Sequence, residues 1–61
     1  MNNSDAITAL NALRYDARMA VENLERPDWA DHVGEAVSWM EQAKADLDHA
    51  IKAVGRPPEA V

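Results

Sequence analysis

A seven-residue repeat in the second half of the chain is the feature that most restricts how it can fold. Larger apolar residues recur every seven positions, and alanines recur at the same interval between them: Val33, Met40, Leu47 and Val54, with Ala36, Ala43 and Ala50. These interleaved positions fall on one side of an α-helix, as the a and d positions of a coiled coil do. The repeat predicts a long amphipathic helix that packs against another helix.

The first half of the chain carries a comparable stripe. Its members recur in steps of three and four residues, with Ile7 and Val21 beside them: Ala6, Leu10, Leu13, Ala17, Ala20 and Leu24. This spacing is typical of an amphipathic helix. Ser4 can cap its first turn, and Pro27 ends it because the residue before a proline is pushed out of the α region. The pattern predicts a helix over about 4–26.

The second helix has recognisable start and stop signals. Asp28 is a good N-cap residue, and Gly55 followed by Pro57 and Pro58 is a typical C-terminal signal. We therefore predict a helix over 28–54. The link between the two helices is short, which makes them antiparallel neighbours.

The expected fold is an all-α antiparallel two-helix hairpin that forms a single domain over residues 1–61, with a flexible tail over 56–61. Such a hairpin has one line of contact, and a chain below about 70–80 residues seldom gains more than about 3–5 kcal/mol from one core. Much of the predicted contact line is alanine, which buries little area. We therefore predict pairing into a homodimeric four-helix bundle, with an obligate partner protein as the alternative.

The net charge of −5 is concentrated in one stretch of the chain. Between residues 28 and 48 there is one base, Lys44, and there are six acids: Asp28, Asp31, Glu35, Glu41, Asp46 and Asp48. The charges in the rest of the chain cancel. This asymmetry predicts a protein partner with a basic surface, and it argues against direct binding to nucleic acid or to an anionic membrane.

Composition limits the compartment and the chemistry. The absence of cysteine excludes disulfides and thiolate metal sites, and it favours a reducing, cytoplasmic location. Neither a signal peptide nor an apolar run long enough to span a bilayer is visible.

Two pairs of potential metal ligands have helical spacing, His32 with Glu35 and Asp46 with His49. Neither pair belongs to an inward-facing cluster of the kind that di-iron bundles use. No nucleophile has an arranged base, and no glycine-rich phosphate loop is present. We predict that the protein is not an enzyme, and that it has no cofactor and no metal.

The aromatic residues allow alternative interpretations. Tyr15 and Met19 lie away from the main stripe of the first helix, on a second apolar face with Thr8 and Ala12. Tyr15 and Trp39 either fold over the edge of the core or anchor an interface, where Tyr and Trp are enriched. Trp29 is predicted to plug the core against the hairpin bend.

These observations predict a small acidic protein that binds a basic protein surface. It would be of the class of phage-encoded inhibitors, anti-CRISPR or anti-restriction proteins, that compete with nucleic acid. The candidate partner-binding residues are Asp31, Glu35, Trp39, Glu41, Asp46, Asp48, Tyr15 and Met19. An alternative is a structural or assembly subunit, in which the second apolar face would contact a larger protein.

A third hypothesis comes from a resemblance. The segments Thr8-Ala9-Leu10-Asn11, Arg14-Tyr15 and Glu25-Arg26 resemble the first helix of Rop, a small plasmid protein that binds paired RNA loops. The resemblance implies a dimeric antiparallel four-helix bundle. It also implies an RNA-binding surface formed by the first helix, with these residues: Asn11, Arg14, Tyr15, Arg18 and Arg26. Asp16 stands where that family has a buried aliphatic residue.

Overall fold

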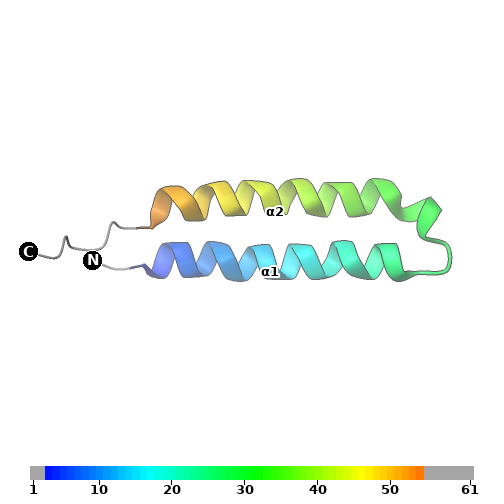
Figure 1. The fold of residues 1–61 in the computed structure, drawn as a ribbon, viewed down its shortest axis with the longest axis horizontal. Helices are drawn as coiled ribbons and strands as arrows, with labels where there is room; N and C mark the ends of the chain where they lie inside the picture. Colours follow the sequence, from blue (N-terminus) through cyan, green and yellow to red (C-terminus); the bar gives the residue numbers. More distant parts are fainter. Residues whose placement is uncertain (1–2, 55–61) are drawn as a thin grey trace, which may run out of the picture.

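The computed structural model describes residues 3–54, which form an antiparallel helical hairpin (Figure 1). Helix α1 spans Ser4–Glu25, a short 3-10 helix η1 spans Trp29–His32, and helix α2 spans Val33–Ala53. The described residues contain no β-strand. The predicted all-α hairpin is confirmed.

Helix α1 has nearly the predicted bounds. It begins after Asn3, whose carbonyl oxygen accepts a hydrogen bond of 2.9 Å from the backbone N–H of Ile7. It ends at Glu25, and Arg26 is extended with φ −68° and ψ 147°. This conformation is the one expected of a residue before proline.

The second helix starts later than predicted. Two tight turns precede it, closed by hydrogen bonds from Trp29 N to Arg26 O (3.0 Å) and from Asp31 N to Asp28 O (2.9 Å). The Asp28 side chain makes no capping hydrogen bond to the backbone, because its carboxylate contacts Arg26 and His32 instead. The prediction that Asp28 directly caps a helix over 28–54 is therefore wrong, and α2 begins at Val33.

At its C-terminal end, α2 stops at Ala53. Val54 is extended, and its N–H donates to Ala50 O at 3.0 Å. The stop signal predicted at Gly55 and the tail predicted over 56–61 lie outside the described residues.

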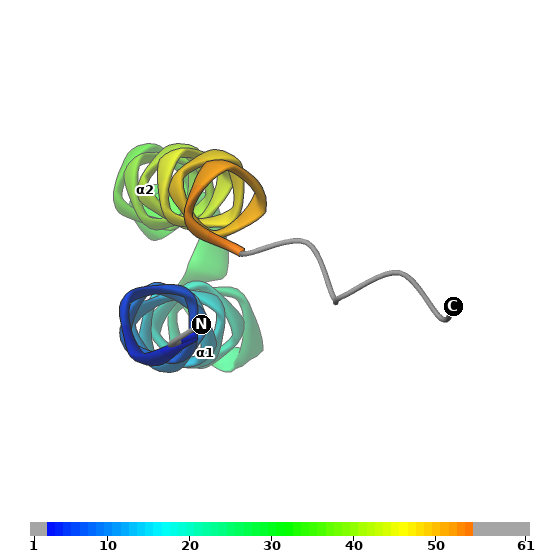
Figure 2. The same cartoon turned by 90° about the vertical axis from the view of Figure 1, so that its left-hand side faces the viewer.

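The two helices lie side by side as a single layer (Figure 2). The line along which they touch, here called the seam, buries small side chains: Ala6, Ala9, Ala20, Ala36 and Ala50. Half-buried Leu13, Trp39 and Ala43 complete its apolar part. Because alanines bring two helix backbones close together, no apolar side chain larger than alanine is fully buried in the seam among the described residues.

This seam corrects part of the predicted core. Most alanines of the two stripes are in place, but Ala17 is exposed, and so are all the larger members except half-buried Leu13: Leu10, Leu24, Val33, Met40, Leu47 and Val54. Trp29, predicted to plug the core, is 50% exposed. It lies in η1, where the 3-10 turn directs the chain around the end of the hairpin rather than into the seam.

None of the helices within residues 3–54 combines the length and the apolar character needed to cross a bilayer.

Candidate functional site

The most unusual surface of the hairpin is formed by large apolar side chains that no part of residues 3–54 covers. Their exposed fractions run from 39% for Leu24 to 65% for Ile51. In α1 they are Ile7, Leu10, Val21 and Leu24; in α2 they are Val33, Val37, Met40, Leu47 and Ile51, followed by Val54. Scattered exposed apolar residues are normal in proteins, but a contiguous apolar patch marks an interaction site.

These side chains share one side of the hairpin. In the sequence, each of these residues directly follows a seam residue or lies one helical turn from a residue that does. Ile7, for example, follows Ala6, and Val37 follows Ala36. One residue advances about 100° around an α-helix. Both helices are right-handed and run antiparallel, so this rotation leads to the same side of the layer in both. We call this surface the apolar face; Ala17 also belongs to it.

Two cations stand at the middle of the apolar face. Arg14 follows the seam residue Leu13, and Lys44 follows Ala43, so both occupy apolar-face positions near the midpoints of their helices. Both side chains are exposed. The face therefore has an apolar half on either side of a charged centre.

The opposite side of the layer, here called the polar face, combines the second apolar face predicted on α1 with mostly polar residues of α2. It consists of residues that directly precede seam positions, among them Thr8, Ala12, Tyr15 and Met19 of α1 and Glu35, Ser38, Gln42, Ala45 and His49 of α2. Its main apolar contact joins the helices: the rings of Tyr15 and Trp39 meet edge to face, with centroids 5.7 Å apart and planes at 79°. Such aromatic pairs add about 0.5–1.5 kcal/mol to the contribution of the buried area alone.

The seam also contains a pair of carboxyl groups. Asp16 of α1 is 5% exposed, and half-buried Asp46 of α2 faces it. When both are ionised, neither Oδ2 atom has a hydrogen-bond donor in the described part of the chain. Asp46 Oδ1 accepts from Gln42 Nε2 at 3.2 Å.

This pairing changes the acidity of Asp16. The hydrogen bond that a protonated Asp16 makes with Asp46 raises the pKa of Asp16 above its ordinary 3.8, and burial and repulsion by the Asp46 charge act in the same direction. Two carboxyl groups that share a site cannot both ionise freely. Asp16 and Asp46 were not expected to meet. The sequence did contain a signal for the position of Asp46. Asp46 lies three residues after Ala43 and four before Ala50, and this spacing makes it a seam position.

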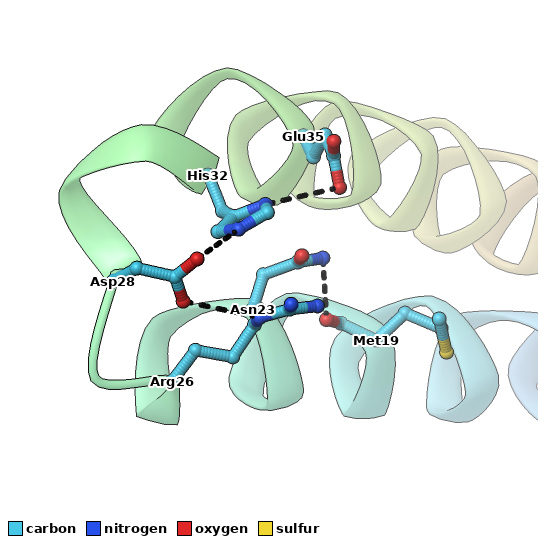
Figure 3. Close-up of polar contacts among 6 residues, drawn as sticks. All are labelled: Met19, Asn23, Arg26, Asp28, His32 and Glu35. Atoms are coloured by element: carbon cyan, nitrogen blue, oxygen red, sulfur yellow. Dashed lines mark hydrogen bonds and ion pairs between the residues drawn. The ribbon is translucent and has the colours of Figure 1, made fainter.

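A chain of polar contacts holds the connection between the helices (Figure 3). Arg26 Nε donates to Asp28 Oδ1 at 3.3 Å, and His32 Nε2 lies 3.0 Å from Asp28 Oδ2. His32 Nδ1 is 3.6 Å from Glu35 Oε2, which is an ion pair only when His32 is protonated. The hydrogen bond from His32 lowers the pKa of Asp28 below 3.8, with Arg26 contributing. This network fixes the bend of the hairpin.

Asn23 is the second buried polar residue of α1, and it lies beside this network (Figure 3). Its Nδ2 donates to Met19 O at 3.0 Å, so its amide is satisfied within its own helix. Asn23 therefore bonds within α1, near the end of that helix.

The predicted partner-binding acids do not form one patch. Asp46 lies in the seam, Glu35 contacts His32, and Asp48 Oδ2 pairs with Lys52 Nζ at 3.3 Å. Asp31 and Glu41 are exposed. The predicted aromatic anchors are brought together as the Tyr15–Trp39 pair, and Met19 is half-buried on the same side.

The residues implied by the resemblance to Rop are spread around α1. Arg14 is on the apolar face and Tyr15 on the polar face, while Arg18 pairs with Glu22 at 3.4 Å on the outer side. Arg26 contacts Asp28 in the connection. RNA binding through this set, with Asn11, stays a prediction.

Within residues 3–54, no three potential metal ligands come together. A shallow hollow on the outer side of α2 is formed by residues of that helix alone, among them Glu41, Lys44 and Leu47. The fold and its surfaces define a class: an all-α helical hairpin with an alanine seam and one uncovered apolar face. The chain matches no protein-family model, no curated protein and no solved structure.

Proposed function

We propose that this protein is a non-catalytic interaction protein whose hairpins pair through their apolar faces into a homodimeric four-helix bundle. The observation that carries the proposal is the apolar face itself. Fully burying one Val, Leu, Ile or Met side chain contributes about 1.5–3 kcal/mol, and ten such residues stand on this face. A second copy presents a surface of the same shape and character.

The sequence pattern supports a second copy as the occupant. Most alanines of the two stripes lie in the seam and most of their larger residues lie on the apolar face; on α1, Ala17 and Leu13 are the exceptions. A four-helix bundle core uses both sets, because each helix then has a neighbour on two sides. The single hairpin buries only part of each stripe, and pairing of two hairpins would bury the rest.

Concentration dependence of thermal unfolding tests this pairing. A homodimer that unfolds to separated chains becomes more stable as the protein concentration rises. We expect the unfolding temperature followed by circular dichroism to rise over a hundredfold concentration series. An unfolding temperature that stays constant across the series would contradict the proposal.

A second candidate function concerns the outer surface of such a dimer. The acidic stretch keeps Asp31, Glu35, Glu41 and Asp48 outside the seam and outside the apolar face. We propose that this surface docks on a basic protein surface and competes with nucleic acid there, as small phage-type inhibitors do. The observation in its favour is the net charge of −5, with two of the cations, Arg14 and Lys44, standing on the apolar face.

Salt-dependent co-purification tests the second candidate. Exposed charges are screened within about 3 Å at about 1 M salt. A partner captured at low salt by the natural chain should be lost at high salt, and it should be lost at low salt with the variant Asp31→Lys, Glu35→Lys. Retention of the partner in both cases would refute the electrostatic part of the proposal.

A further inference from the structure

We propose that the two hairpins pair about a twofold axis parallel to the helices, so that α1 of each copy packs against α2 of the other. Both connections, residues 26–32, then lie at the same end of the bundle. This inference rests on the proposed pairing through the apolar face, and it specifies the orientation of the partner copy.

Two symmetric arrangements can bring two such faces together. With the axis parallel to the helices, α1 lies against the partner's α2, and the connections are at one end. With the axis lying across the helices, α1 lies against the partner's α1 and α2 against the partner's α2, and the connections are at opposite ends. All neighbouring helices are antiparallel in both arrangements, so helix direction alone does not choose between them.

The apolar side chains do not distinguish between the two arrangements either. The outer border of the apolar face carries Ile7 and Val21 on α1 and Val37 and Ile51 on α2, all β-branched and all exposed. Each pair stands on either side of a central cation. The borders of the two helices are therefore alike in shape, and they differ in charge.

The middle of the α1 border is positive. Arg14 stands on the apolar face, and Arg18 lies one turn further along the helix towards the outer side. Their summed charge is +2, and Asn11 beside them is neutral. The contact of Arg18 with Glu22 is weak, because the Arg18 side chain remains 76% exposed and the Nε–Oε1 distance is 3.4 Å.

The middle of the α2 border is negative. Glu41 and Asp48 lie on the outer side, three residues before and four residues after Lys44. Two acids and one base give a summed charge of −1. Asp48 pairs with Lys52, but its side chain remains 66% exposed and can meet a second cation.

These charges favour the arrangement with the connections at one end. The charged residues stand near the middle of each helix, so the middle of one helix lies beside the middle of its neighbour in both arrangements. With α1 against α2, each of the two borders joins +2 to −1. With like helices together, one border joins +2 to +2 and the other joins −1 to −1. Electrostatic complementarity fixes the orientation of partners more than it adds affinity.

A distance between the two connections tests this orientation directly. The chain has no cysteine, so Ala30→Cys gives one attachment point per copy, on the exposed η1. Neighbouring helices are about 8–10 Å apart, and spin labels at the same end of the bundle should lie within about 20–25 Å of each other. At opposite ends they would be separated by the length of the bundle, more than about 30 Å at 1.5 Å per residue.

Pulsed electron spin resonance on the labelled dimer reads this distance. We expect a distribution centred below about 25 Å. A dimer with labels more than about 30 Å apart would overturn the orientation and leave the proposed pairing intact. If both the labelled and the unlabelled protein sedimented with the mass of one chain, this result would overturn the proposed pairing and this inference with it.

Charge exchange provides a second test with an internal control. In the proposed orientation, Arg14→Glu with Arg18→Glu places −2 against −1, so the dimer dissociation constant at low salt should rise about tenfold or more. Adding Glu41→Lys and Asp48→Lys to the same chain places −2 against +3 and should restore dimerisation. In the other arrangement, Arg14→Glu with Arg18→Glu changes the charge of both facing α1 borders from +2 to −2. The two borders repel each other before and after the change. A dissociation constant unchanged by the first variant would therefore contradict the proposed orientation.

Discussion

The seam and the apolar face are built from the same heptad stripes and differ in the size of the side chains they receive. The seam takes most of the alanines, such as Ala36 with no exposed surface, and half-buried Leu13, while the apolar face takes the other leucines, the valines and Met40. Small residues allow two helices to approach closely but bury little area. The alanines therefore set the shape of the hairpin, and the exposed larger residues are the ones that the proposed pairing would bury.

The largest expected effect comes from breaking the apolar face. Leu10→Lys with Leu47→Lys places two charges where the proposed dimer buries two leucines per chain, each contributing about 1.5–3 kcal/mol. We expect this variant to sediment as a single chain and to lose much of its helical signal. Ala12→Lys with Ala45→Lys, on the polar face, is the matched control and should retain the dimer mass. A leucine variant that remains dimeric would show that the apolar face is not the contact.

The next effect comes from enlarging the seam. Ala36→Leu forces a larger side chain into a completely buried position, and overpacking of this kind typically costs about 1–3 kcal/mol. The urea midpoint of unfolding should fall. Ala45→Leu adds the same atoms at an exposed position of the same helix and should leave the midpoint nearly unchanged. Equal midpoints for both variants would mean that the seam is not closely packed at Ala36.

A smaller effect is expected from the carboxyl pair of the seam, and it depends on pH. The raised pKa of Asp16 means that the folded chain holds a proton that the unfolded chain has released, so stability falls as the pH rises above 3.8. Asp16→Asn removes this loss. We expect the variant to unfold at a higher temperature than the natural chain at pH 7, and the difference to shrink as the pH falls towards 3.8.

The control for Asp16→Asn is Asp31→Asn, which removes the same kind of charge from an exposed position. It should not reproduce the pH-dependent gain. If Asp16→Asn lowered the unfolding temperature at pH 7, the carboxyl pair would be stabilising and the account of the seam would be wrong.

The smallest effect is expected at the connection, because the side chain of Asp28 is about half exposed, at 51%. The lowered pKa of Asp28 means that its contribution is present above 3.8 and is lost as the pH falls through the lower value of the folded chain. His32→Gln should therefore reduce the loss of stability on the acid side of 3.8. Thermal unfolding between about pH 2 and pH 5 measures this loss of stability. If the loss in the variant were as steep as in the natural chain, the Asp28–His32 contact would be excluded as its cause.

The sequence predicted the hairpin well because its signals are local. Pro27 ends α1 through its effect on the conformation of Arg26, and the heptads of α2 follow from spacing alone. The start of α2 was missed because the Asp28 side chain turns to Arg26 and His32, a contact made only once the chain has reversed direction.

The division of each stripe between two surfaces could not be predicted from spacing. A stripe of alternating Ala and Leu or Met fits a two-helix seam and a four-helix core equally well, and only the close approach of the helices decides which residues the hairpin buries. Spacing does place Asp46 at a seam position, but it does not predict the contact of Asp46 with Asp16. Its partner Asp16 comes from the other helix, and its proximity depends on the register of the hairpin.

The mass of the natural chain in solution shows whether two hairpins pair through their apolar faces. Sedimentation equilibrium at neutral pH, over a range of micromolar concentrations, should give twice the chain mass of 6.7 kDa, because two apolar faces cover each other. A mass of 6.7 kDa at every concentration, from a chain that remains helical, would show that the hairpin is stable with its apolar face uncovered and would contradict the account.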